Sequence, residues 1–216
     1  IDKNGSISYQ KLLENSKKIG SGLGKFVKNN DPVPVYMEKG ISALEVFMGA
    51  LYSGGFYSLL NVGLPKMRLE QIINVLDVDY IVTDNEHLED AKVFFPDKEL
   101  ILYEDLIKEE INDDLLNEIR KKKIDLDPVY ANFTSGSTGV PKGVIVGNRS
   151  IIDFVDNFVD TFGIKDDDVI ANQAPFDFDV SVKDIYPALK TGATLVIVPK
   201  ELFSRPAELI DFLVEH

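Results

Sequence analysis

The sequence predicts an α/β protein built from mainly parallel β-sheets flanked by helices. Short apolar runs alternate with amphipathic segments of helical length along the whole chain. Strands that alternate with helices form βαβ units, in which neighbouring strands run parallel. No repeat or low-complexity tract interrupts this alternation. With 216 residues, of which 44% are hydrophobic, the chain can bury a substantial core.

The first α/β portion is expected to span residues 1–128. Ser8 is a suitable N-cap for a helix whose apolar residues recur at helical spacing. Strands are expected at 32–37, 56–60, 79–84 and 99–103, with helices at 41–54 and 68–76. The segment 104–127 is the most charged part of the chain, which predicts a solvated helix followed by a surface connection.

The second portion is expected to span residues 129–216. Its apolar runs predict strands at 129–134, 143–147, 169–172 and 194–198. Helices are expected at 149–162 and 181–190, and a last one begins near Arg205. Ile1 is not a methionine, and the final helical pattern reaches His216 without a stop signal. We therefore interpret the chain as a fragment, an incomplete N-terminal domain.

Composition and charge exclude several classes of function. A formal net charge of -13 repels nucleic acid phosphates and anionic lipid, so no nucleic acid partner is expected. No apolar run reaches the roughly 18 residues of a membrane span. Cysteine is absent and the histidines number two, which argues against a metal site or a histidine-based triad in this chain. A reducing, cytoplasmic location fits the absence of cysteine.

The loop at 134–143, TSGSTGVPKG, carries the clearest chemical signal. Hydroxyl and backbone N–H donors at this density suit a polyanion, above all a phosphate chain. Glycines permit close backbone approach, and Lys142 adds a compact positive charge that could neutralise a departing pyrophosphate. The alternative is a polar β-hairpin loop without a function. Because Lys142 is followed by Gly143, the G-K-[ST] ending of P-loop kinases and GTPases is missing.

The segment YANFTSGSTGVPKGV (130–144) resembles the signature loop of the adenylate-forming, or AMP-binding, superfamily. That superfamily includes acyl-CoA synthetases, luciferases, adenylation domains of nonribosomal peptide synthetases and D-alanine–carrier-protein ligases. The resemblance implies that the loop wraps the β- and γ-phosphates of ATP, with Lys142 also acting in catalysis. The residues implied in this role are Thr134, Ser135, Gly136, Ser137, Thr138, Gly139 and Lys142.

Two further segments, 50–73 and 176–198, resemble the amino acid-activating branch, and 184–213 is similar to D-alanine–carrier-protein ligases. In this branch the aspartate that matches Asp179 binds the α-ammonium of the substrate. Such a carboxylate makes charge-assisted hydrogen bonds to an ammonium, whereas a fatty or aryl acid would leave it unpaired. The alternative is that Asp179 caps a helix that begins near Val180.

The resemblance also places Val180 and Lys183 in the pocket for the substrate side chain. A lysine at that position would suit an acidic side chain. The simpler interpretation, which we favour, is an i,i+4 ion pair between Asp179 and Lys183, worth only a few tenths of a kcal/mol. The acidic-substrate hypothesis predicts that Lys183→Ala changes the substrate preference of the intact enzyme.

The implied reaction is adenylation of an amino acid by Mg-ATP, followed by transfer to the thiol of a phosphopantetheinylated carrier protein. An acyl- or aryl-CoA synthetase and a non-catalytic nucleotide-binding relative are the alternatives. Family motifs for adenine, ribose and Mg²⁺, and the small C-terminal domain with its catalytic lysine, are not found in this sequence. We therefore expect the Mg²⁺ ligands to lie mostly outside this chain, and the chain alone to be inactive.

Overall fold

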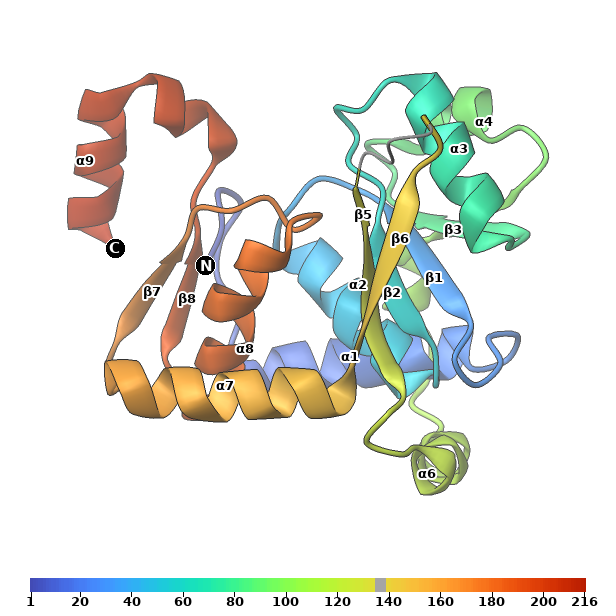
Figure 1. Cartoon of the computed structure of the whole chain (residues 1–216), viewed down its shortest axis with the longest axis horizontal. Coiled ribbons are helices and arrows are strands. Elements are labelled where there is room, and N and C mark those ends of the chain that lie inside the picture. Colours follow the sequence, from blue (N-terminus) through green and yellow to red (C-terminus); the bar gives the residue numbers. More distant parts are fainter. Residues whose placement is uncertain (135–138) are drawn as a thin grey trace.

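The computed structural model describes residues 1–134 and 139–216, which form two sheets with helices around them (Figure 1). The larger sheet has six strands in the order β4-β3-β1-β2-β5-β6, and the smaller pairs β7 with β8. The strands are β1 (Pro32–Tyr36), β2 (Phe56–Leu59), β3 (Tyr80–Thr83), β4 (Glu99–Leu102), β5 (Pro128–Thr134), β6 (Lys142–Gly147), β7 (Val169–Asn172) and β8 (Thr194–Ile197).

Helices connect most of these strands, as the alternating pattern predicts. They are α1 (Tyr9–Leu23), α2 (Ile41–Tyr52), α3 (Lys66–Leu76), α4 (Leu88–Phe94), α5 (Tyr103–Leu106), α6 (Asp113–Lys122), α7 (Asn148–Phe162), α8 (Val182–Thr191) and α9 (Pro206–Glu215), with the 3₁₀ turns η1 (Asp179–Ser181) and η2 (Lys200–Ser204). Ser8 accepts a hydrogen bond from the Lys11 N–H and so caps α1 as expected.

Strands β1 to β5 pair in parallel, as do β7 and β8, so the predicted mainly parallel architecture is confirmed. The exception is the hairpin of β5 and β6, whose strands are antiparallel and end with Thr134 opposite Lys142. Because β5 pairs with β2, the larger sheet extends across the expected boundary between residues 128 and 129.

Successive side chains along each strand point to opposite faces of the larger sheet, and both faces are buried. Val35 belongs to the core that packs against α1 and α2, whereas its neighbour Tyr36 packs with α3 and α4 on the other face. Likewise, Val82 belongs to the first of these cores and its neighbour Ile81 to the second. This period of two is what an extended backbone imposes on a sheet that is covered on both sides.

The smaller sheet is joined to the larger one through a shared core. Helix α7 runs from the end of β6 to the smaller sheet (Figure 1). The ring centroid of Phe176 lies 5.7 Å from that of Phe47 on α2. The hydroxyls of Tyr57 and Tyr186 lie 2.9 Å apart, so β2 is also tied to α8. These contacts fix the start of α8 relative to the strands of the larger sheet.

The charged segment 104–127 departs from the expectation of one solvated helix. It contains α5 and α6, and Lys123 at the end of α6 is partly buried. Its ammonium donates to the carbonyl of Gly54 at 2.7 Å and to Asn30 Oδ1 at 3.1 Å. Burial lowers the pKa of Lys123. Helix α4, which was not expected, covers one face of the larger sheet.

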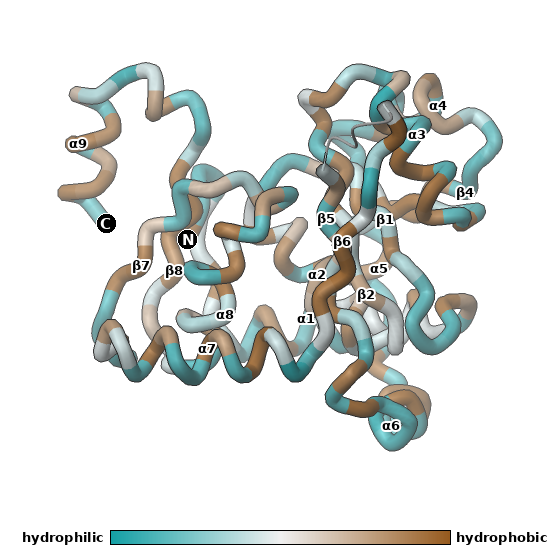
Figure 2. Tube along the Cα trace, in the orientation of Figure 1, coloured by the Kyte–Doolittle hydropathy of each residue, from teal (hydrophilic) through white to brown (hydrophobic). Residues whose placement is uncertain are grey.

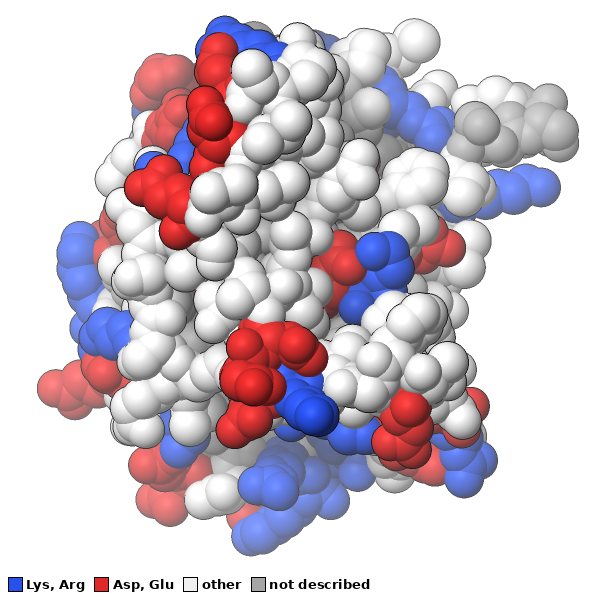
Figure 3. Space-filling view, turned by 90° about the vertical axis from the view of Figure 1, so that its left-hand side faces the viewer, with Lys and Arg blue, Asp and Glu red and all other residues white. Residues whose placement is uncertain are grey.

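The outer surface combines exposed apolar residues with small mixed groups of charge. Figure 2 shows β6 as a largely hydrophobic edge strand, and Val144 and Ile145 are 51% and 60% exposed. On the face seen in Figure 3, acidic and basic side chains lie close together and uncharged surface separates the groups. Among the described residues, the helices are too short or too polar to cross a membrane.

Candidate functional site

The end of the β5–β6 hairpin carries the described part of the predicted phosphate loop. Thr134 and Lys142 face each other across the two strands, and both are exposed. Gly139 has a φ of +82°, a left-handed conformation that favours glycine. Four of the predicted residues lie outside the described residues, so their role stays a prediction. These are Ser135, Gly136, Ser137 and Thr138.

A second cation reaches this end of the hairpin from α3. Arg68, in the first turn of that helix, donates from Nη2 to the carbonyl oxygen of Thr134 at 2.9 Å. A guanidinium has five N–H donors in a planar fork, so this bond leaves others for an anion. Arg68 could not be found from the sequence, because it lies far from the loop in the chain and comes to it through the packing of α3 on the sheet.

Asp179 lies beside β5, next to the hairpin end. With the carboxamide of Asn132 turned so that its oxygen faces η1, that oxygen accepts from the Asp179 N–H at 3.1 Å and the Asn132 nitrogen donates to the Ala131 carbonyl at 3.3 Å. Burial raises the pKa of Tyr130 on the same strand, and the nearby charge of Asp179 adds to this shift. The residue predicted to bind the substrate ammonium is thus held two residues along the strand from Thr134.

The structure corrects both structural alternatives for Asp179. The cap of η1 is Phe178 and the cap of α8 is Ser181, so Asp179 is not the N-cap of the helix. The expected ion pair with Lys183 is also wrong, because the Lys183 ammonium lies 2.8 Å from Asp184 Oδ1 instead. Asp179 is the first residue of the 3₁₀ turn η1, which precedes α8. Because a 3₁₀ turn has three residues per turn, Asp179 and Lys183 do not lie on the same side. Within the described ranges, Asp179 has no ion-pair partner.

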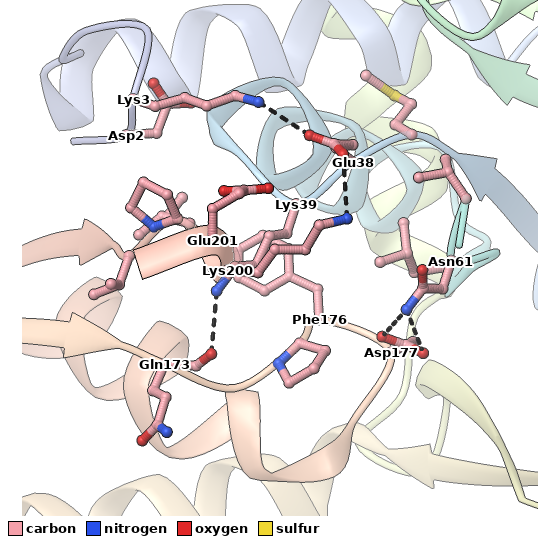
Figure 4. A pocket seen from close by; sticks show the side chains of 17 residues that line it. Asp2, Lys3, Glu38, Lys39, Asn61, Gln173, Phe176, Asp177, Lys200 and Glu201 are labelled. Atoms are coloured by element: carbon pink, nitrogen blue, oxygen red, sulfur yellow. Dashed lines mark hydrogen bonds and ion pairs between the residues drawn. The ribbon is translucent and has the colours of Figure 1, made fainter. Parts of the chain in front are cut away.

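The half-buried side chains of Asn61 and Lys39 hold the turn that leads to Asp179 (residues 173–178). Asn61, which follows β2, donates from Nδ2 to both carboxylate oxygens of Asp177 at 3.2 Å (Figure 4). Lys39 donates to the carbonyl of Gln173 at 3.1 Å, and burial lowers its pKa. The sequence analysis missed these contributors, since each comes from a strand end distant in the chain.

A cavity of about 120 Å³ adjoins this turn, at the carboxyl ends of β1, β2 and β8. Its apolar lining includes Met37, Leu59 and Phe176. Glu38 lies at the rim of the cavity. Its carboxylate is 3.0 Å from the ammonium of Lys3 and 3.4 Å from the ammonium of Lys200. The described residues of the predicted site do not line this cavity. They are Thr134, Gly139, Lys142, Asp179, Val180 and Lys183. Val180 is instead 44% exposed on η1.

Over residues 1–134 and 139–216, the structure brings together no group of three or more histidine, aspartate or glutamate side chains that could hold a metal ion. The donors at the hairpin end are hydroxyl, amide and cationic groups, which suit an anion rather than a metal. The described residues therefore do not fit a Mg²⁺ site by themselves.

Comparison with known proteins matches the whole chain to one family. The protein-family model with the description "AMP-binding enzyme" matches residues 1–216. The chain is 30% identical to the D-alanine–D-alanyl carrier protein ligase of Lacticaseibacillus casei over 195 residues, which is 90% of the chain and 38% of that ligase. It is 33% identical to surfactin synthase subunit 1 of Bacillus subtilis over 209 residues, which is 94% of the chain and 6% of that synthase.

The fold is also found among solved structures. The AMPPNP-bound form of the nonribosomal peptide synthetase FmoA3 has a TM-score of 0.80 and 23% sequence identity, and the match covers 92% of the chain and 21% of that structure. The relatives thus include both subgroups that the sequence resembles. The chain spans well under half the length of these curated relatives.

Proposed function

The chain belongs to the AMP-binding enzyme family, and from this premise we propose that the full-length protein adenylates an amino acid with ATP and transfers it to a carrier-protein thiol. The name of the Lacticaseibacillus casei relative supplies the first substrate to test, D-alanine, and the class of partner, a carrier protein. The match to surfactin synthase subunit 1 supports the same proposal, since the sequence also resembles peptide synthetase adenylation domains.

The observation that carries this proposal is the state of Asp179. Its side chain is exposed, its backbone is held by Asn132, and the nearby lysine that could neutralise it is bound to Asp184. An exposed carboxylate whose backbone is held and that has no cationic partner in the described structure is suited to bind an ammonium group. A fatty or aryl acid has no ammonium, so it would leave this carboxylate unpaired.

The first step follows from the arrangement along β5. With its ammonium on Asp179, the amino acid directs its own carboxylate toward the hairpin end that carries Thr134 and Lys142. A carboxylate oxygen attacks the α-phosphorus of ATP, the bond from that phosphorus to the bridging oxygen breaks, and pyrophosphate leaves. In this proposal Lys142 and Arg68 offset the charge of the phosphates, because preorganised cations lower such a barrier. The hydrogen bond from Arg68 to the Thr134 carbonyl supports this, since it holds that cation at the hairpin end.

In the second step the thiolate of the phosphopantetheine arm attacks the acyl carbon. The carbon–oxygen bond to AMP breaks, which leaves a thioester on the carrier and free AMP. Mg²⁺ accompanies ATP in this proposal and screens its phosphate charge, with ligands that the described residues do not supply. Because the Lacticaseibacillus casei ligase extends far beyond the matched region, we propose that the 216-residue chain alone catalyses neither step.

Amino acid-dependent ATP–pyrophosphate exchange by the full-length protein tests the proposal. The panel contains D- and L-alanine, aspartate, glutamate, a bulky apolar amino acid and a fatty acid. Exchange with an amino acid is expected, and Asp179→Ala is expected to reduce it by at least about a hundredfold through loss of the ammonium contact. Asp160→Ala, an exposed aspartate on α7, is the matched control and should leave exchange unchanged.

The other outcomes of this experiment are informative. Exchange with the fatty acid alone would move the protein to the acyl-CoA synthetases and overturn the role of Asp179. Failure of every substrate to support exchange, with ATP still bound, would favour a non-catalytic nucleotide-binding relative. Turnover by the isolated 216-residue chain would refute its proposed inactivity.

A further inference from the structure

Two tyrosines join the larger sheet to the helix that follows Asp179. The hydroxyl of Tyr57, on β2, lies 2.9 Å from the hydroxyl of Tyr186, on α8. Tyr57 is 4% exposed, and its ring stacks on Phe47 of α2, with ring centroids 4.1 Å apart and an angle of 7° between the ring planes. Burial raises the pKa of both phenols, so the contact is a hydrogen bond between two neutral hydroxyls.

This hydrogen bond supplies direction to a contact that is otherwise held by apolar packing. Val182 and Ile185 of α8 belong to the same core as Phe47 and Tyr57. Apolar packing presses the helix against that core, but it is non-directional and tolerates small displacements. A hydrogen bond requires a set distance and angle between its two groups. The hydroxyl pair therefore defines where α8 lies relative to β2.

The position of α8 is transmitted to Asp179 through a short turn. Asp179 is the first residue of η1, and α8 begins three residues later at Val182. Within this turn the Ser181 N–H donates to the Phe178 carbonyl at 3.0 Å, and the Ser181 hydroxyl donates to the same oxygen at 2.8 Å. A turn closed by two hydrogen bonds moves with the helix that follows it, so a displacement of α8 displaces Asp179.

Strand β5 supplies the second point of attachment. Tyr130 of β5 lies opposite Tyr57 of β2 in the parallel register, with their ring centroids 5.8 Å apart. Two residues further along β5, the side-chain oxygen of Asn132 accepts from the Asp179 N–H at 3.1 Å. Asp179 is thus held at its own backbone from β5 and through α8 from β2. Because β2 and β5 are neighbours in one sheet, the two points are fixed relative to each other.

We propose that Tyr57 and Tyr186 are positioning residues for the amino acid substrate, because their hydroxyl pair holds α8 where the Asp179 carboxylate meets the substrate ammonium. This inference rests on the proposed function, in which Asp179 binds that ammonium. Neither tyrosine has to touch the substrate. The hairpin end that carries Thr134 and Lys142 belongs to β5 and β6, so ATP binding does not depend on the hydroxyl pair.

The test is amino acid-dependent exchange by the full-length protein carrying Tyr186→Phe. This variant keeps the ring but leaves the Tyr57 hydroxyl without its partner, and α8 can shift. The KM for the amino acid that supports exchange should rise about tenfold, because the ammonium contact is displaced but not removed as it is in Asp179→Ala. The KM for ATP should not change. The Tm should fall, because a buried hydroxyl without a partner is destabilising.

A double variant separates positioning from folding. Tyr57→Phe/Tyr186→Phe removes both hydroxyls, so no buried polar group is left unpaired and the Tm should return toward that of the unmodified protein. The directional link is still missing, so the KM for the amino acid should stay raised. The matched control is Tyr80→Phe, which loses the bond from the Tyr80 hydroxyl to the Pro32 carbonyl at 2.9 Å. Tyr80 lies on β3, two strands from β2, so this control should lower the Tm and leave both KM values unchanged.

Three results would overturn the inference. One is an unchanged amino acid KM in Tyr186→Phe, and another is an equal rise of both KM values. The third is a double variant whose amino acid KM recovers together with its Tm, which would show that the hydroxyls serve packing alone. The proposed function fails differently, since the unmodified protein would then show no exchange that depends on both an amino acid and Asp179.

Discussion

The hairpin end and the turn around Asp179 are two halves of one proposed site, yet they are built differently. At the hairpin end, Thr134 and Lys142 are exposed and the Arg68 guanidinium bonds to the Thr134 carbonyl. The turn is held by side chains from two strand ends, Asn61 and Lys39. The hairpin end therefore depends mainly on local backbone, with one cation brought by the packing of α3, and the turn depends on tertiary packing.

The largest effect predicted from this comparison is at Lys142. Replacing Lys142 with methionine removes the charge that offsets the departing pyrophosphate, and kcat for exchange should fall about a hundredfold. Thermal stability should hardly change, because the side chain is exposed. Lys165→Met, at another exposed lysine, is the control. A loss of less than about threefold would remove Lys142 from the proposed catalytic role.

A smaller effect is predicted at Arg68. The variant Arg68→Met loses one charge-assisted bond to the Thr134 carbonyl, so the KM for ATP should rise about fivefold, equivalent to about 1 kcal/mol. The KM for the amino acid should stay the same, because that substrate is bound at the turn. Arg120→Met on α6 provides a comparison at an exposed arginine. Equal changes in both KM values would contradict the division of the site into two halves.

The smallest effect concerns the pH dependence of stability at the turn. Burial lowers the pKa of Lys39, so between that lowered value and about 10.5 the unfolded chain binds more protons than the folded chain. The contribution of Lys39 to the free energy of unfolding therefore increases as pH rises through this window. Lys39→Met should lack this increase, which urea unfolding of the 216-residue chain between pH 8 and 10.5 can measure. Parallel curves for both proteins would contradict it.

The same difference explains what the sequence could and could not predict. The strand–helix alternation is local, so the expected strands and the mainly parallel sheet are confirmed. The phosphate loop at 134–143 was predicted from a contiguous motif, and the structure describes Thr134 and residues 139–143 of it at the end of the hairpin. Helix α4 and the division of 104–127 into α5 and α6 were missed, since short helices have weak periodicity.

The expected ion pair between Lys183 and Asp179 is wrong, and the cause lies in the tertiary structure. A spacing of four residues predicts a contact only on a continuous α-helix, and η1 interrupts that helix. The competing partner, Asp184, is adjacent in sequence, but it gains its importance from burial against Asn172 on β7. Arg68 and Asn61 reach the site from α3 and β2, and no pattern within a short window links them to it.

In the proposed function, strand β5 sets the separation between the two substrates. Asn132 and Thr134 are two residues apart on it, a separation of about 7 Å in an extended strand. Alternation places both side chains on one face, so in the proposed function the strand sets the distance between the ammonium and the phosphates and the side on which both bind. An insertion of one residue between them would turn one contact to the opposite face, and the two reactants would no longer meet.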